Sequence, residues 1–213
     1  MLSSICLPYR QLMKIVVEKI NTLPPSGAMA GVYTNVDNNS GVWKAPANVA
    51  VMSTSALTLN ISESMQADLN VDALTGKSIN AIRAFMGRGV LVWGARTLDG
   101  NSPDWRYINV RRTITMIEQS IKLAMKAYIF ELNDANTWIA IKSMISSFLY
   151  NIWKQGALQG AKSDDAFSIS VGLGSSITAE DIMNGTLRVI VKLAVVLPAE
   201  YIVISLEQQQ QSS

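Results

Sequence analysis

Hydrophobic residues recur at helical spacing in three parts of the chain. In the segment 9–21 they return every three or four positions, and Pro24-Pro25 follows shortly afterwards. Because proline cannot continue a helix, this spacing predicts a helix that packs by its apolar face and ends near residue 21. Two longer amphipathic helices are predicted at about 110–130 and 136–154. The first of these carries a single apolar stripe, formed by Ile114, Ile117, Ile121, Ala124, Met125 and Tyr128.

Alternation of apolar and polar residues predicts strands in other segments. The segments 82–85 and 90–97 are separated by a turn with glycine at both ends, Gly87-Arg88-Gly89, which predicts a hairpin or two adjacent strands. Another strand is predicted at 166–173. In the segment 187–197 every second residue is apolar, and the basic side chains lie on the other face. This alternation predicts a strand with one buried face.

Two further segments have other patterns. The stretch 24–75 is rich in Gly, Pro, Asn and Ser, which predicts a long ordered loop region with one or two short strands. The segment 178–184 predicts a short helix with Thr178 as its N-cap, and Glu180 and Asp181 lie in the first turn, where the helix dipole favours carboxylates. Together the elements predict an α/β (α+β) fold with a mixed sheet flanked by two long amphipathic helices.

The last predicted strand, at 199–207, is apolar on both faces. A strand buried on both faces usually lies in the middle of a sheet, yet this one is followed only by a polar tail. A strand near a chain end can also add to the edge of a sheet in another subunit. The pattern alone leaves these two alternatives equal, an ordinary last strand of the chain's own sheet or a strand donated to a neighbour.

Composition favours an assembling protein. The 213 residues suffice for one well-filled core, and one domain is the simpler expectation. Charged residues make up 16% of the chain, where soluble domains have roughly a quarter. The low charge indicates surface covered by other chains. A net charge of +2 predicts no nucleic-acid partner, no apolar run is long enough for membrane insertion, and the single cysteine, Cys6, excludes an internal disulfide.

Candidate catalytic chemistry is sparse. The chain contains no histidine, which excludes Ser-His-Asp and Cys-His arrangements, and we predict no metal, no cofactor and no enzymatic activity. The segment 75–78 looks like the end of a phosphate-binding loop, but Val71 stands where that loop needs glycine. The segment 172–176 lies between a predicted strand and helix but lacks a third glycine. A nucleotide-binding α/β enzyme remains the less favoured alternative.

Blocks of characteristic sequence occur in a fixed order between residues 21 and 208. They include Pro24–Tyr33, Gly41–Asn48, Gly87–Leu98, Trp105–Arg112 and Leu197–Ile202. In content and order these blocks resemble the C-terminal domain of contractile tail sheath proteins from myophages, R-type bacteriocins and extracellular contractile injection systems.

The resemblance implies a structural subunit that polymerises as a helical sheath around an inner tube and contracts to drive the tube through a target envelope. The implied partners are further copies of the chain, the inner tube protein, and baseplate and terminator proteins. Assembly would take place in the bacterial cytoplasm, and the product would be a phage tail or a tail-like particle that can be released extracellularly. A sheath-like adaptor or terminator that does not polymerise is the alternative.

The resemblance also assigns candidate site residues and domain boundaries. In sheath proteins a C-terminal strand is donated to a sheet in a neighbouring subunit, which here corresponds to Tyr201, Ile202, Val203, Ile204, Ser205, Leu206 and Glu207. Candidate tube-facing residues are Lys162, Glu180 and Asp181. Residues 1–22 correspond to a remnant of a longer family N-terminal region, 23–200 to the sheath C-terminal domain, and 201–213 to the donor strand and polar tail. The family's N-terminal donor strand is expected to be absent from this chain.

Overall fold

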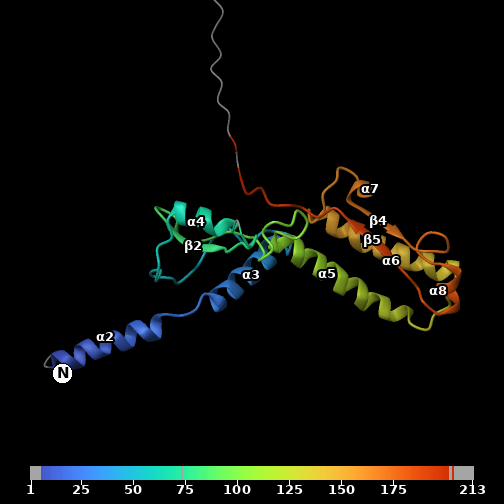
Figure 1. Cartoon of the computed structure of the whole chain (residues 1–213). Coiled ribbons are helices and arrows are strands. Elements are labelled where there is room, and N and C mark those ends of the chain that lie inside the picture. The colour runs from blue at the N-terminus through green and yellow to red at the C-terminus, as the bar shows by residue number, and fades with distance from the viewer. Residues whose placement is uncertain (1–5, 73, 202, 204–213) are drawn as a thin grey trace, which may run out of the picture. The chain divides into compact units, whose positions relative to one another are not determined.

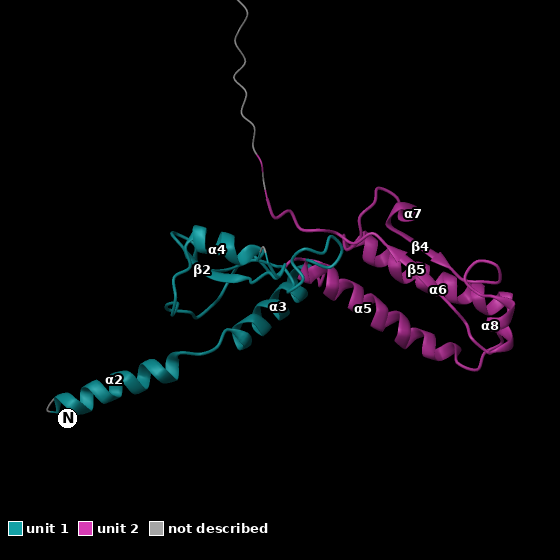
Figure 2. Cartoon of the chain, in the orientation of Figure 1, with its two compact units in different colours: residues 1–40, 46–106 teal, residues 41–45, 107–213 magenta. Residues whose placement is uncertain are grey.

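The chain forms two compact units (Figure 1, Figure 2). The computed structural model describes residues 6–72, 74–201 and 203. Unit 1 comprises residues 1–40 and 46–106, and unit 2 comprises residues 41–45 and 107–213. Sequence length had favoured a single domain. The boundaries expected from the family plan, after residues 22 and 200, differ from this division and stay a prediction.

The predicted N-terminal helix is confirmed as α2 (Leu7–Asn21). A proline lies in its first turn, where a missing N–H costs no hydrogen bond. Thr22 closes the other end, because its backbone N–H and its hydroxyl both donate to the Glu18 carbonyl. None of the residues of α2 is buried. The expectation that its apolar face packs on another element is therefore not met within the described chain.

The predicted loop region 24–75 is wrong in two places, where helices form. The larger is α3 (Ser26–Ser40), and its buried residues Val32 and Val36 lie one turn apart and pack against Val92 of the adjacent sheet. Glycine and asparagine lower the helix propensity of this segment, but propensity is a weak preference that burial of an apolar face can override. The smaller is α4 (Glu63–Asn70).

The sheet of unit 1 contains β1 (Val49–Ala50), β2 (Ala81–Phe85) and β3 (Gly89–Trp93) in the order β1-β3-β2. The strands β2 and β3 pair antiparallel, with Ala81 opposite Trp93. The predicted hairpin is therefore confirmed, although its second strand ends four residues earlier than expected. Arg83 links the sheet to α4, because its guanidinium donates to Gln66 Oε1 at 2.7 Å.

The two long helices of unit 2 are confirmed as α5 (Ile108–Met125) and α6 (Ala135–Lys154), with the 3₁₀ turn η1 (Lys126–Tyr128) after α5. The Asp134 carboxylate caps α6 by accepting the Thr137 N–H at 2.9 Å. The core of the unit lies between the helices and a small sheet. Its fully buried helical residues are Ile117, Ile141, Ile145 and Leu149.

The sheet of unit 2 consists of β4 (Phe167–Ser170) and β5 (Ile190–Leu193), paired antiparallel. The short helices α7 (Ser163–Ala166) and α8 (Ala179–Met183) flank β4, and α7 was not predicted. The predicted alternation is confirmed, since the residues packed against the helical core are Leu187, Val189, Val191, Leu193 and Val195. The α/β class is confirmed too, but the strands form two small antiparallel sheets and not one mixed sheet.

Candidate functional site

The candidate donor strand lies at the end of the described chain. Tyr201 and Val203 are 68% and 90% exposed and belong to no strand of this single chain. The other candidates, Ile202, Ile204, Ser205, Leu206 and Glu207, lie outside the described residues. The described part of the segment therefore presents an aromatic and an aliphatic side chain to solvent.

Residues 194–200, which we call the stem, connect β5 to the candidate donor strand. Their first half is fastened to unit 2 by backbone hydrogen bonds: Ala194 N–H donates to the Ala166 carbonyl at 2.9 Å, and Val196 N–H donates to the Ala157 carbonyl at 3.3 Å. Gln159 N–H donates in turn to the Ala194 carbonyl at 2.7 Å. These backbone bonds of the stem thus reach as far as Val196.

Side chains from the start of α5 hold the stem as well. The Asn109 amide nitrogen donates to the Val196 carbonyl at 3.1 Å, and the Tyr107 hydroxyl donates to Glu200 Oε2 at 3.0 Å. Sequence reasoning missed both residues. The signal for Asn109 was present, because it lies at helical spacing from Thr113 and Ile117, and all three are buried on one stripe of α5.

The β4–β5 sheet offers two open edges. The bond from Ala194 to Ala166 lies one position beyond the pair formed by Phe167 and Leu193. In an antiparallel ladder, hydrogen-bonded pairs alternate with non-hydrogen-bonded pairs. The backbone groups of Phe167 therefore face away from β5, and those of Val191 face away from β4. The described part of the chain adds no third strand to this sheet, so each outer edge can accept an extended segment.

The three predicted tube-facing residues differ in their surroundings. Lys162, just before α7, and Glu180, in α8, are exposed. Asp181 instead forms a capping box with Thr178 and an ion pair with Arg188 at 3.2 Å. The Thr178 backbone N–H, its hydroxyl and the Arg188 guanidinium together lower the pKa of Asp181. No hydrogen bond or ion pair joins Lys162 to either carboxylate within the described chain.

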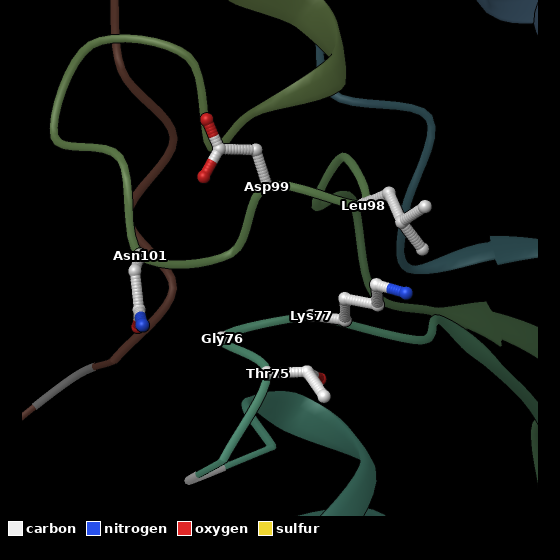
Figure 3. A pocket seen from close by; sticks show the side chains of 6 residues that line it. All are labelled: Thr75, Gly76, Lys77, Leu98, Asp99 and Asn101. Carbon is white, nitrogen blue, oxygen red and sulfur yellow. The ribbon is translucent and has the colours of Figure 1, made fainter.

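The glycine turn at 75–78 borders an open pocket of about 370 Å³ in unit 1 (Figure 3). Its geometry is that of a carboxylate-closed turn, because Asp72 accepts the backbone N–H groups of Leu74 and Thr75. Figure 3 shows the Lys77 side chain directed away from Asp99 on the opposite wall. The next element is strand β2, whereas a phosphate loop needs a helix whose N–H groups face the ligand. The pocket is lined by Thr75, Gly76, Lys77, Leu98, Asp99 and Asn101.

The second glycine turn, at 172–176, is closed by hydrogen bonds from its own backbone amides. The backbone N–H groups of Ser175, Ser176 and Ile177 all donate to the Gly172 carbonyl, at 3.0–3.2 Å. A phosphate-binding loop needs such N–H groups turned toward the ligand. Neither glycine turn therefore has the geometry that a nucleotide-binding enzyme requires.

Metal-ligand clusters and membrane-spanning helices are both absent from the described residues. No group of three or more Cys, Asp and Glu side chains there is arranged to hold a metal ion. None of the described helices combines the length and the apolar character needed to cross a membrane.

Fold and site together describe an α/β protein with two small antiparallel sheets, and comparison with known proteins identifies its class. Residues 101–209 match the family model described as the phage tail sheath C-terminal domain. The chain belongs to this family. It is also 30% identical over 139 residues to the tail sheath protein of Vibrio phage KVP40, and 25% identical over 130 residues to that of Enterobacteria phage T4.

Solved structures place the chain more narrowly, beside sheaths of contractile injection systems. It is 43% identical to the sheath of the extracellular contractile injection system PVC in the contracted state, with a TM-score of 0.83 over 88% of this chain. It is 41% identical to the helical sheath of the anti-feeding prophage in its contracted state, with a TM-score of 0.81. The predicted resemblance is thereby confirmed.

The matches cover only part of each relative. The chain spans 51% of the PVC sheath chain and of the anti-feeding prophage sheath chain. The matched segment corresponds to 20% of the KVP40 tail sheath protein and 19% of the T4 protein. The matched family and the fold of the solved sheath structures both point to a structural protein.

Proposed function

We propose that this chain is a structural subunit of a contractile sheath, which polymerises around an inner tube and contracts to drive the tube through a target envelope. The observation that carries the proposal is its 43% identity, over 88% of its length, to a sheath chain in the contracted state. Its work is mechanical, with no catalytic step. The proposed setting is a phage tail or tail-like particle assembled in the bacterial cytoplasm.

Subunits are linked by strand addition. In this link, residues 201–207 of one copy pair with an outer edge of the β4–β5 sheet in another copy. Main-chain hydrogen bonds supply the link, and the side chains on both faces of the added strand supply the grip. Two observations support this: the exposure of Tyr201 and Val203, and the outward-facing backbone groups of Phe167 and Val191. A head-to-tail contact of this kind generates an open helix when its rotation does not close into a ring.

The inner tube contacts unit 2 through charged side chains near α7 and α8. Lys162 and Glu180 are exposed, which leaves both charges available to a partner. Asp181 contributes less, because Thr178 and Arg188 already engage its carboxylate. Baseplate and terminator proteins contact the two ends of the sheath.

A pair of truncations tests the strand link. Removal of residues 201–213 should leave a folded, soluble chain that forms no filaments, whereas removal of residues 208–213 keeps the donor strand and should leave filaments intact. Negative-stain electron microscopy shows whether each variant forms filaments, and circular dichroism checks that each variant is folded. Normal sheaths from the longer truncation would overturn the strand-donation mechanism.

A second candidate function is an adaptor that docks on a sheath end without polymerising. The observation that favours it is a likeness to a chain of the anti-feeding prophage baseplate, with 41% identity and a TM-score of 0.80. Mass photometry distinguishes the two functions. A subunit gives filaments whose length grows with protein concentration, whereas an adaptor gives monomers or rings of one fixed size at every concentration.

A further inference from the structure

The start of α5 binds two distant parts of unit 2 through a single side chain. Asn109 is 1% exposed, and its amide nitrogen donates to the Trp43 carbonyl at 3.0 Å and to the Val196 carbonyl at 3.1 Å. An amide nitrogen has two hydrogens, so each carbonyl receives one of them. The first partner lies in the segment 41–45, and the second lies in the stem.

The Tyr107 side chain binds the far end of the same stem. It precedes α5 directly, and its hydroxyl donates to Glu200 Oε2 at 3.0 Å. Between the two bound positions, Val196 and Glu200, lies Pro198, whose ring fixes its φ angle. The stem is therefore held at both ends and has a stiff residue in the middle. The next described side chains, Tyr201 and Val203, are exposed.

The cost of burying Asn109 argues against an ordinary packing role. Its Oδ1 atom is buried without a hydrogen-bond partner in the described chain, as is the Thr113 hydroxyl one turn further along α5. A buried acceptor without a partner destabilises a protein, and an apolar residue of similar shape would avoid that loss. What only an amide supplies at this position is two donors aimed at two carbonyls.

We propose that Tyr107 and Asn109 form a stem clamp, which fixes the place and direction in which the C-terminal segment leaves unit 2. They are positioning residues for the donated strand, and the inference rests on the proposed strand donation. A strand that leaves from a fixed point meets the neighbouring sheet edge at a higher effective concentration than a freely swinging one. The clamp also passes a pull on the donated strand to α5 and the core.

Tyr107→Phe is the sharpest test, because it removes one exposed hydroxyl and nothing from the core. In the full chain, hydrogen exchange at the Val196 amide, which donates to the Ala157 carbonyl, should accelerate by about fivefold, since opening of the stem becomes easier. The midpoint of unfolding should not change. Tyr9→Phe in α2 is the matched control and should leave stem exchange unaltered.

Spin labels give a second readout that a purely stabilising role would not move. In a Cys6→Ser background, labels at Val203→Cys and at Asn151→Cys on α6 report the spread of distances between the segment and the helix. The distance distribution should broaden in Tyr107→Phe while the thermal midpoint stays the same. An unchanged distribution together with unchanged exchange would overturn the clamp.

Asn109→Asp removes both donors with little change in shape and should accelerate exchange along the whole stem, including Val196. Thr113→Val is its control, because it replaces a buried hydroxyl that has no partner and should leave the stem protected. If Asn109→Asp fails to fold, the Tyr107→Phe result alone still tests whether the stem clamp exists. Failure of strand donation would be seen separately, as normal filaments from the chain truncated after residue 200.

Discussion

The helices α2 and α6 carry similar amphipathic patterns and have opposite fates. In α6, Ile141 and Leu149 are completely buried, and Ile145 is 1% exposed. In α2, Leu12 is 58% exposed and Ile20 is 67% exposed, and none of its residues is buried. Both patterns predicted a helix, and both helices formed. Within the described chain, only the apolar face of α6 is buried.

The difference shows what an amphipathic pattern encodes. The pattern predicts that one face of the helix is buried, but it does not indicate whether the same chain or another chain buries that face. A helix of 15 residues has little stability of its own in water, because most helical stability in proteins comes from packing of the apolar face. The stability of α6 is therefore internal to the subunit, whereas α2 gains no such packing within the described chain.

The largest expected contrast is in local stability. Backbone amides in the middle of α6 should exchange only through global unfolding, whereas those of α2 should exchange through local fraying, with protection lower by at least about 10³-fold. Hydrogen exchange of the dilute chain measured by mass spectrometry checks this. Protection of α2 equal to that of α6 in a monomer would break the comparison.

Truncation of an apolar side chain should lower the free energy of unfolding much more in α6 than in α2. Leu149→Ala in α6 should lower the free energy of unfolding by about 2–5 kcal/mol, because it leaves a cavity in a closed core. Leu12→Ala in α2 is the matched change and should cost less than about 0.5 kcal/mol, since the leucine is already exposed. Urea titration followed by circular dichroism measures both. Equal losses would show that α2 is packed after all.

Acid should weaken the start of α6. Its N-cap, Asp134, accepts the backbone N–H of Thr137, and this bond lowers the pKa of the carboxyl below its ordinary value of 3.8. A group whose pKa is lower in the folded state stabilises the fold above its unfolded pKa. That stabilisation is lost as pH falls through the folded pKa. Unfolding midpoints measured from pH 6 down to about 2 should therefore fall less steeply in Asp134→Asn.

The smallest effect concerns the start of α2, which lacks a side-chain cap. Its N-cap residue is Cys6, whose extended backbone suits a capping residue but whose side chain makes no capping hydrogen bond. Cys6→Asp should stabilise α2 by about 0.5–1 kcal/mol, because the carboxylate can accept an orphan N–H. Far-ultraviolet circular dichroism should show a small rise in helicity, and Cys6→Ala should show none.

Patterns of local spacing predicted much of the fold. The ends of α6 were predicted to within one residue, and the Thr178 cap of α8 was confirmed. The helix α3 was missed because its glycines and asparagines are typical of loops. Its helical state depends on packing of Val32 and Val36 against a sheet formed much later in the sequence.

The candidate site was predicted less completely, for a related reason. A run of apolar residues can mark 201–207 as a strand, but no local pattern indicates what holds the residues before it. Tyr107 and Asn109 bind partners that lie 93 and 87 positions away, respectively, so their role follows from the tertiary structure alone. The role of the strand itself came from family resemblance.

The sequence separation of the Asn109 contacts also sets an order of events during synthesis. Its two carbonyl partners lie 66 positions before it and 87 positions after it. Contacts of long sequence separation form late, because the intervening loop must first close. A nascent chain can complete α5 and α6 well before Val196 has left the ribosome. The last bonds to close are therefore those that aim the C-terminal segment, which delays the chain's readiness to join a neighbour until its own core is folded.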